Sequence, residues 1–279
     1  MVLNSSDSFV IYQLPHSNQR FYRTGTWNKY TQQTQGFIIQ SFNNQKSFIL
    51  EGKKQLLDTS DIQINLPNKE QRNNALNREQ YLKQLNTFIQ ACQKDIDKVI
   101  SSRIINQKIP SDFDLFNAFE KLATQNKNAL VYILNIPNIG MWMGATPETL
   151  LRSSPTETYT IALAGSQDNN NLKPWEEKEI EEHEYVIEDI SKKLNQKHIS
   201  HSIGKMQTIT AGKVAHLKTR IDIQSKLADI KTVENTNILS LVGVVFLKRD
   251  KNSADSPILD KINSRINKTL RLFHDKAVS

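Results

Sequence analysis

Apolar residues recur every three to four positions in three stretches of the chain, and this spacing predicts three amphipathic helices. The first begins at Asn77, which can cap it, and places Cys92 on its apolar face. The second runs from Ser111 to Ala123 and directs its phenylalanines to the core. The third spans 178–194, and its apolar positions are Ile180, Val186, Ile187, Ile190 and Leu194.

Runs rich in β-branched and aromatic residues alternate with polar turns and predict strands, starting with an antiparallel sheet at the N-terminal end. The stretch 51–77 is dominated by Lys, Asn, Gln and Asp, so we expect a surface insertion that contributes no element to the core. The predicted strands are 9–12, 36–39, 47–50, 97–105, 129–134, 139–144 and 158–163.

Composition is that of a globular chain, with 38% hydrophobic and 23% charged residues among 279. This length suits one large domain or two ordinary ones. The N-terminus lacks the layout of a signal peptide, and the longest apolar run, 238–247, is too short to span a bilayer. We therefore expect a cytoplasmic protein. The single cysteine, Cys92, excludes an internal disulfide, and we expect its thiol to be buried and inert.

The net charge of +7 would favour nucleic acid or an anionic membrane as a partner if it formed one basic surface. From residue 217 onward, however, twelve Lys and Arg stand against seven Asp and Glu, so this part carries +5 of the total. No basic stripe interleaved with aromatic residues precedes it. We therefore expect neither nucleic acid nor a membrane as a partner, and the oligomeric state is left open.

The acidic start of the third helix carries the first candidate chemistry. At 3.6 residues per turn, Glu179, Glu182 and His183 project on neighbouring parts of one face, beside apolar residues that point inward. Carboxylates near a core favour a bound cation. An acidic run taken alone is equally typical of a solvated helix face.

Two further features have both a chemical and a structural interpretation. Lys98 lies at the entrance of a predicted strand, where it is either solvated charge or, if partly desolvated, a neutral amine that can act as a base. The small residues Ala164, Gly165 and Ser166 follow another strand, where they either let backbone amides approach an anion or simply form a turn.

Five blocks of the chain resemble, in order and spacing, motifs of the chorismate-utilising enzyme family, and within it most closely the isochorismate synthase branch. The resemblance covers about residues 9–223 and implies an α+β fold, with large antiparallel sheets flanked by helices around a central cleft. The blocks are 97–103, 144–151, 162–166, 178–183 and 216–219.

The resemblance assigns the chemistry of the reaction to two residues. Lys98 matches the general base that activates a water for attack on C2 of chorismate, and Glu148 matches the general acid that protonates the departing C4 hydroxyl. A lysine at this position distinguishes the water-using isochorismate and salicylate branches from the ammonia-using anthranilate branch.

The resemblance also assigns a metal and a substrate pocket. Glu182 matches a Mg²⁺ ligand and Glu179 a second acidic group beside it, which suits a metal that prefers oxygen ligands. The small residues Ala164, Gly165 and Ser166 match a loop against the substrate. His216 and Thr219 match positions that line the substrate pocket, although a histidine in such a place can also have a purely structural role.

The family pattern stops soon after residue 223, and its later motifs are missing. We expect residues 1–76 to form a β-rich part of the fold with its polar insertion, 77–223 the chorismate-binding catalytic region, and 224–279 a divergent basic tail. The tail is interpreted as a truncated or frame-shifted continuation of the gene. The alternative is a basic amphipathic helix from Ser256 onward that covers the fold or meets a partner or membrane surface.

The function that these observations predict is Mg²⁺-dependent conversion of chorismate to isochorismate, feeding menaquinone or siderophore biosynthesis. Two alternatives stay open at this point. The chain is either a salicylate synthase or a non-catalytic remnant of the family, which could bind a partner through a sheet edge left by the missing strands.

Overall fold

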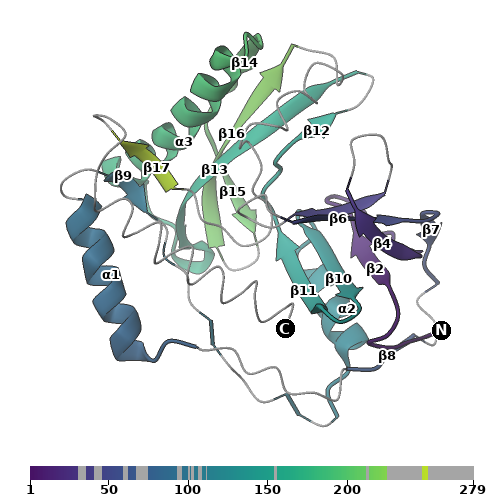
Figure 1. Ribbon diagram of the computed structural model, residues 1–279. Coiled ribbons are helices and arrows are strands. Elements are labelled where there is room, and N and C mark those ends of the chain that lie inside the picture. The colour runs from purple at the N-terminus through teal and green to yellow at the C-terminus, as the bar shows by residue number, and fades with distance from the viewer. Residues whose placement is uncertain are drawn as a thin grey trace.

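The structure is a computed structural model of the chain, in which antiparallel sheets and three long helices form an α+β fold (Figure 1). The described residues are 1–30, 36–40, 46–58, 62–66, 75–92, 96–99, 101, 104–105, 109–110, 112–153, 156–211, 214–224 and 247–250. Within these ranges no helix is both long and apolar enough to cross a membrane.

A five-stranded antiparallel sheet, which we call the first sheet, combines strands from the N-terminal part of the chain with a hairpin from its middle. Its residues alternate between the two faces, so that Phe9 and Ile11 point to one side and Val10 and Tyr12 to the other. Both sets are buried. In spatial order the strands are β11 (Gly140–Thr146), β10 (Leu130–Ile136), β2 (Phe9–Gln13), β3 (Phe21–Thr24) and β7 (Gln55–Leu56).

Two different layers cover this sheet. Helix α2 (Leu115–Gln125) packs Phe116 and Phe119 against one face, together with the short parallel pair β1 (Val2–Leu3) and β8 (Gln63–Ile64). The other face meets a small sheet whose strands are β4 (Thr26–Lys29), β6 (Ser47–Glu51) and β5 (Phe37–Gln40).

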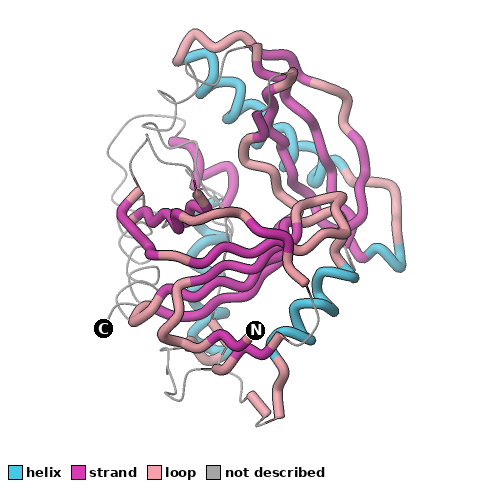
Figure 2. Tube along the Cα trace, turned by 90° about the vertical axis from the view of Figure 1, so that its right-hand side faces the viewer, coloured by secondary structure: helices cyan, strands magenta, loops and turns pink. Residues whose placement is uncertain are grey.

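A separate group of strands, the second sheet, lies above the first sheet in both views (Figure 1 and Figure 2). Helix α3 (Glu177–Gln196) covers one face of it and packs Val186, Ile187 and Ile190 against buried residues of the strands. The order of its main strands is β12 (Arg152–Ser153), β13 (Thr158–Asp168), β16 (Val214–Ile223) and β14 (His201–Ile203), and β15 (Gln207–Ala211) also pairs with β16. The short helix η1 (Asn169–Asn171) links β13 to the segment before α3.

Burial on β16 follows the two-residue period of a strand. Ala215, Leu217, Thr219, Ile221 and Ile223 are buried, whereas the residues between them are half-buried. The second sheet is therefore packed on its α3 side and is more open on the other.

The remaining described elements are α1 (Arg78–Cys92), β9 (Ile96–Val99) and β17 (Leu247–Asp250). Asn77 and Gln80 exchange hydrogen bonds between side chains and backbone at the start of α1, as expected for a helix cap. β17 pairs antiparallel with β9, and Lys248 lies opposite Lys98 in this register.

The α+β class and the antiparallel sheets flanked by helices are confirmed. Three local predictions are wrong. The thiol of Cys92 is exposed, because α1 buries only Phe88 and Ala91. The polar stretch 51–77 does contribute to the core, where Leu57 and Ile64 are buried. The second helix begins after Asp114, whose carboxylate caps it by accepting a hydrogen bond from the backbone N–H of Asn117.

The domain limits stay predictions. The tail helix expected from Ser256 onward lies outside the described residues, as does most of the tail.

Candidate active site

Gly165 lies at an irregularity in β13, where the pairing with β16 shifts register between Ala164 and Gln167. Its φ of +72° falls in the left-handed region that favours glycine. A Cβ atom added there would lie 3.4 Å from the side chains of Trp175 and Leu217. The sequence placed the small residues after the strand, whereas the structure places them within it.

The first turn of α3 packs against this irregularity. A Cβ atom on Gly165 would lie 3.6 Å from the Cβ atom of Glu179, so the helix approaches the strand closely at this point. The indole N–H of Trp175 donates a hydrogen bond to the hydroxyl of Thr208 on β15, with 2.8 Å between the heavy atoms. The segment that leads into α3 is therefore fixed to the second sheet, and Glu179 is placed beside Gly165.

The side chain of His216 on β16 contacts two residues of the same irregularity, Gly165 and Ser166. Its Nδ1 atom lies 2.9 Å from the carbonyl oxygen of Gly165 and 2.9 Å from the hydroxyl oxygen of Ser166. A carbonyl oxygen can only accept, so Nδ1 carries the proton and donates it. In the neutral ring, Nε2 is then the nitrogen with a free lone pair for another group.

The acidic residues Glu179 and Glu182 are half-buried and lie about one turn apart on α3. Negative side chains in the first turns of a helix are favoured by the positive end of its macrodipole. Among the residues that the structure describes, no group of three or more His, Cys, Asp and Glu could hold a metal ion. Two carboxylates fit Mg²⁺ that takes its remaining ligands from substrate oxygens and water, which is how this ion is often held.

Thr219 lies on the opposite face of β16 from His216, because the two residues are three positions apart on one strand. Its hydroxyl is 2.8 Å from Nε2 of His183 on α3, and the two residues are 1% and 0% exposed. The prediction that Thr219 lines a substrate pocket stays a prediction. What the structure adds is a buried link between helix and sheet.

Glu148 lies in the segment that joins the two sheets. It follows β11 by two residues and is half-buried. Directly after it, the carbonyl oxygen of Thr149 accepts a hydrogen bond from the N–H of Ile161, and that of Leu150 accepts one from the hydroxyl of Thr160. Both donors lie on β13, so the backbone at Glu148 is fixed between β11 and the second sheet.

On β11, the strand that leads to Glu148, the position of Gly144 has no space for a side chain. Gly144 on β11 pairs with Tyr132 on β10, and a Cβ atom on Gly144 would lie only 2.7 Å from the hydroxyl oxygen of Tyr132. The ring of Tyr132 therefore occupies the space that a larger residue would take. Burial raises the pKa of Tyr132 to about 12.

The candidate residues thus fall into groups. His216 binds Ser166 and Gly165 at the irregularity of β13, Glu179 lies beside Gly165 on the α3 side of the sheet, and Ala164 is buried next to them. Glu182 shares α3 with Glu179, Glu148 lies on the linking segment, and Lys98 lies on β9. Sequence reasoning assigned no role to His183, although its place among the apolar positions of the helix marked it as an inward-facing residue.

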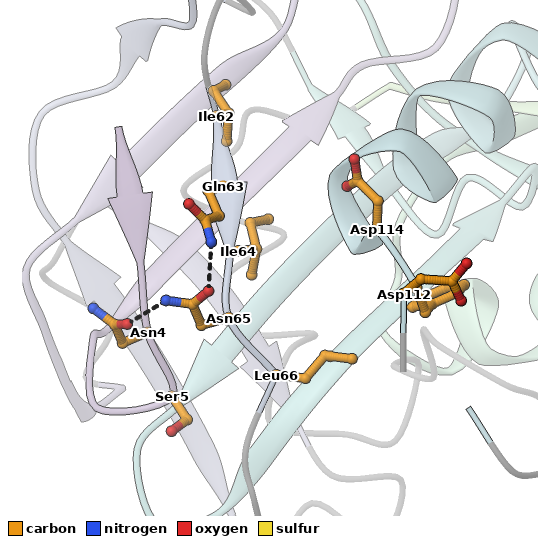
Figure 3. Close-up of a pocket in the computed structure, with 10 residues that line it drawn as sticks. Asn4, Ser5, Ile62, Gln63, Ile64, Asn65, Leu66, Asp112 and Asp114 are labelled. Carbon is orange, nitrogen blue, oxygen red and sulfur yellow. Dashed lines mark hydrogen bonds between the residues drawn. The ribbon is translucent and has the colours of Figure 1, made fainter. Parts of the chain in front are cut away.

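A cavity of about 720 Å³ lies elsewhere in the molecule (Figure 3). It opens between β8 and the start of α2, far from α3 in Figure 1. The carboxamide of Gln63 donates to that of Asn65, which donates to that of Asn4, and the carboxylate of Asp114 caps α2. None of the candidate residues lines this cavity, so it is not the candidate site.

Solved structures share the fold. DhbC from Bacillus anthracis, described as a 2,3-dihydroxybenzoate-specific isochorismate synthase, superimposes with a TM-score of 0.62 at 18% identity, over 84% of this chain and 72% of that one. MenF, the menaquinone-specific isochorismate synthase of Escherichia coli, gives a TM-score of 0.61 at 16% identity, over 79% and 65% of the respective chains.

Among curated proteins, the isochorismate synthase EntC of Escherichia coli, strains K12 and O157:H7, is 29% identical over 135 residues. The match takes in 44% of this chain and only 34% of EntC. The model of the family described as "Chorismate binding enzyme" matches residues 12–239, which is most of the chain. This chain is therefore a member of the chorismate binding enzyme family.

Proposed function

We propose that this protein is an isochorismate synthase, which converts chorismate to isochorismate in the presence of Mg²⁺. The observation that carries the proposal is the approach of α3 to the glycine of β13, which places Glu179 beside Gly165, while His216 binds the carbonyl oxygen of Gly165 from the other face of the sheet. An acidic residue of α3 thus lies against a stretch of backbone without a side chain. The family membership and the similarity to EntC support chorismate as the substrate.

The reaction requires a base that removes a proton from water and an acid that protonates the departing hydroxyl. Lys98 as the neutral amine takes a proton from water as the water oxygen bonds to C2 of the ring, and the two ring double bonds shift. The bond from C4 to its hydroxyl then breaks, and Glu148 supplies the proton with which that oxygen leaves as water. The product is an isomer of the substrate, and no oxidant, reductant or co-substrate is consumed.

Glu182 and Glu179 are the residues that would hold the metal. Mg²⁺, when bound, would neutralise the substrate carboxylate and orient it. His216, with its Nδ1 proton donated to the Gly165 carbonyl, would keep the turn of β13 in place against the substrate. The cavity near β8 has no role in this scheme.

The first experiment incubates the purified chain with chorismate and Mg²⁺ and identifies the product by chromatography and NMR. We expect isochorismate, and we expect Lys98→Ala and Glu148→Gln each to lower kcat at least about 100-fold, the usual contribution of a general acid or base. Lys192→Ala is the matched control, because Lys192 is an exposed lysine on α3 and should leave kcat unchanged.

Two other results have clear meanings. Release of pyruvate with formation of salicylate would assign the chain to the salicylate branch. No turnover by a folded chain that binds chorismate would refute the enzymatic proposal and favour the non-catalytic remnant. The proposal includes a role in menaquinone or siderophore biosynthesis. Deletion of the gene, followed by measurement of menaquinone and siderophore levels, tests it.

A further inference from the structure

A buried polar pair joins α3 to the second sheet in the middle of an apolar interface. Nε2 of His183 and the hydroxyl oxygen of Thr219 are 2.8 Å apart, and both residues are nearly or completely inaccessible to solvent. Around them the interface is formed by aliphatic side chains such as Ile190 and Ile221. A buried polar group is unfavourable unless it is hydrogen-bonded, so each member of this pair depends on the other.

The strands provide room for the imidazole ring. Thr219 lies directly opposite Ala162 of β13, and Ala162 is completely buried. Alanine has no side chain beyond Cβ, so a wide aromatic ring on the helix can lie over this pair of strands. The next residue of β16 on the same face, Ile221, is again large and apolar. The imidazole of His183 is therefore accommodated over Thr219 and Ala162, and a shift along β16 would bring it against the larger side chain of Ile221.

The same link fixes the carboxylates of the candidate site. Glu179 and His183 are four residues apart and lie above one another on the helix surface. Glu179 lies against Gly165 on β13, and His183 is bound to Thr219 on β16. Glu182 directly precedes His183. Apolar side chains alone allow a helix to shift or rotate by small steps, whereas a hydrogen bond requires one position.

We propose that His183 is a positioning residue, whose bond to Thr219 holds the first two turns of α3 so that Glu179 and Glu182 are presented together to a divalent cation beside Gly165. The proposal rests on the proposed function in so far as that function places the metal on α3. It gives Thr219 a role through His183.

The test compares Thr219→Val, which removes the hydroxyl but keeps the shape, with Thr219→Ser, which keeps the hydroxyl. Mn²⁺ alone is the probe, and its affinity for the full chain is measured by electron paramagnetic resonance, with Mg²⁺ as competitor. We expect Thr219→Val to weaken Mn²⁺ binding about 10-fold or more, the usual effect of losing a group that orients a metal ligand. Thr219→Ser, which keeps the hydroxyl, should bind Mn²⁺ with close to the affinity of the wild type.

Hydrogen exchange of the backbone amides gives a second readout that needs neither metal nor substrate. Thr219→Val should speed exchange in residues 179–183 and leave 130–136 on β10 unchanged, because only the start of α3 loses its bond to the sheet. If Thr219→Val does not fold, His183→Gln and His183→Leu replace the pair. Glutamine can still bond to Thr219 and should retain Mn²⁺ binding, whereas leucine should not.

The outcomes separate this proposal from the proposed function. Wild-type affinity and exchange in Thr219→Val would overturn the positioning role. Absence of Mn²⁺ binding by the wild type, or equal binding by Glu182→Gln and the matched control Glu188→Gln, would overturn it as well, by removing the metal from α3. Mn²⁺ binding that depends on Thr219, without turnover of chorismate, would support the positioning role and contradict only the enzymatic proposal.

Discussion

The two large sheets of this protein are covered in different ways. The two central strands of the first sheet, β2 and β10, are buried on both faces, under α2 on one side and under the sheet of β4, β5 and β6 on the other. The second sheet is packed under α3 on one face, and its other face carries half-buried polar residues such as His216, Lys218 and Arg220.

The difference suggests distinct roles: the first sheet is a structural scaffold, and the second sheet together with α3 carries most of the candidate residues. The central strands β2 and β10 carry apolar residues on both faces, so they are packed from both sides, as expected for a structural core. The second sheet has a smaller apolar cluster, and its helix interface includes the polar pair of His183 and Thr219. All candidate residues except Lys98 and Glu148 lie on the second sheet or on α3.

The largest expected effect is loss of packing in the scaffold. Phe119→Ala removes a completely buried ring from the α2 side of the first sheet and should lower the free energy of unfolding by about 3 to 5 kcal/mol. Ile190→Ala on α3 is the comparison, and because Ile190 is only half-buried the loss should be about 1 to 2 kcal/mol. Urea denaturation measures both, and equal losses would show that the two sheets are packed alike.

Part of this comparison could be predicted from the sequence. The short continuous runs of β-branched and aromatic residues in 9–12 and 129–134 predict buried strands, and the spacing of Ile180, Val186 and Ile190 predicts the packed face of α3. The three long helices and the main strands follow from such local patterns. The family motifs added the candidate residues, and the family itself is confirmed.

The remainder depends on contacts between distant segments. The register shift at Gly165 arises from the pairing of β13 with β16, and nothing in the sequence near Gly165 shows where that partner strand lies. His183 and Thr219 are 36 residues apart, so their bond could be found only once α3 was placed on the sheet. The burial of Ile64 was missed because its neighbours Gln63 and Asn65 are polar, and that of Leu57 because it follows an exposed two-residue strand and belongs to no long apolar run.

An intermediate effect is expected at alkaline pH in the scaffold. Burial raises the pKa of Tyr132 from 10.0 to about 12. The unfolded chain ionises this tyrosine near pH 10, whereas the folded chain keeps the proton up to about pH 12. Stability is therefore unaffected below pH 10 and falls by up to about 3 kcal/mol as the pH rises to 12.

Tyr132→Phe isolates this contribution, because phenylalanine keeps the ring over Gly144 but has no proton to lose. The difference in unfolding free energy between the wild type and the variant should be constant from pH 7 to 9 and should shift in favour of the variant from pH 10 to 12. Urea titrations across this range measure it. A pH-independent difference would mean that the hydroxyl of Tyr132 is solvated, and that this face of the first sheet is more open than its burial indicates.

The smallest effect is expected on the open face of the second sheet. Arg220 binds Asp222 on its own strand and Glu157 before β13, and its guanidinium lies 3.8 Å from the ring centre of Tyr159. The hydrogen bonds to Asp222 and then to Glu157 raise the pKa of Arg220. These groups are exposed or half-exposed, so water and salt screen the charges.

Arg220→Gln should therefore cost less than about 1 kcal/mol of unfolding free energy, and the cost should shrink in 1 M salt. The fold of the variant should be unchanged, because the apolar packing of β16 is on its other face. Urea denaturation at low and high salt measures the effect. A loss of unfolding free energy that exceeds that of Ile190→Ala and does not respond to salt would show that this face is a buried core. The two large sheets would then be packed alike, and the contrast between them would not hold.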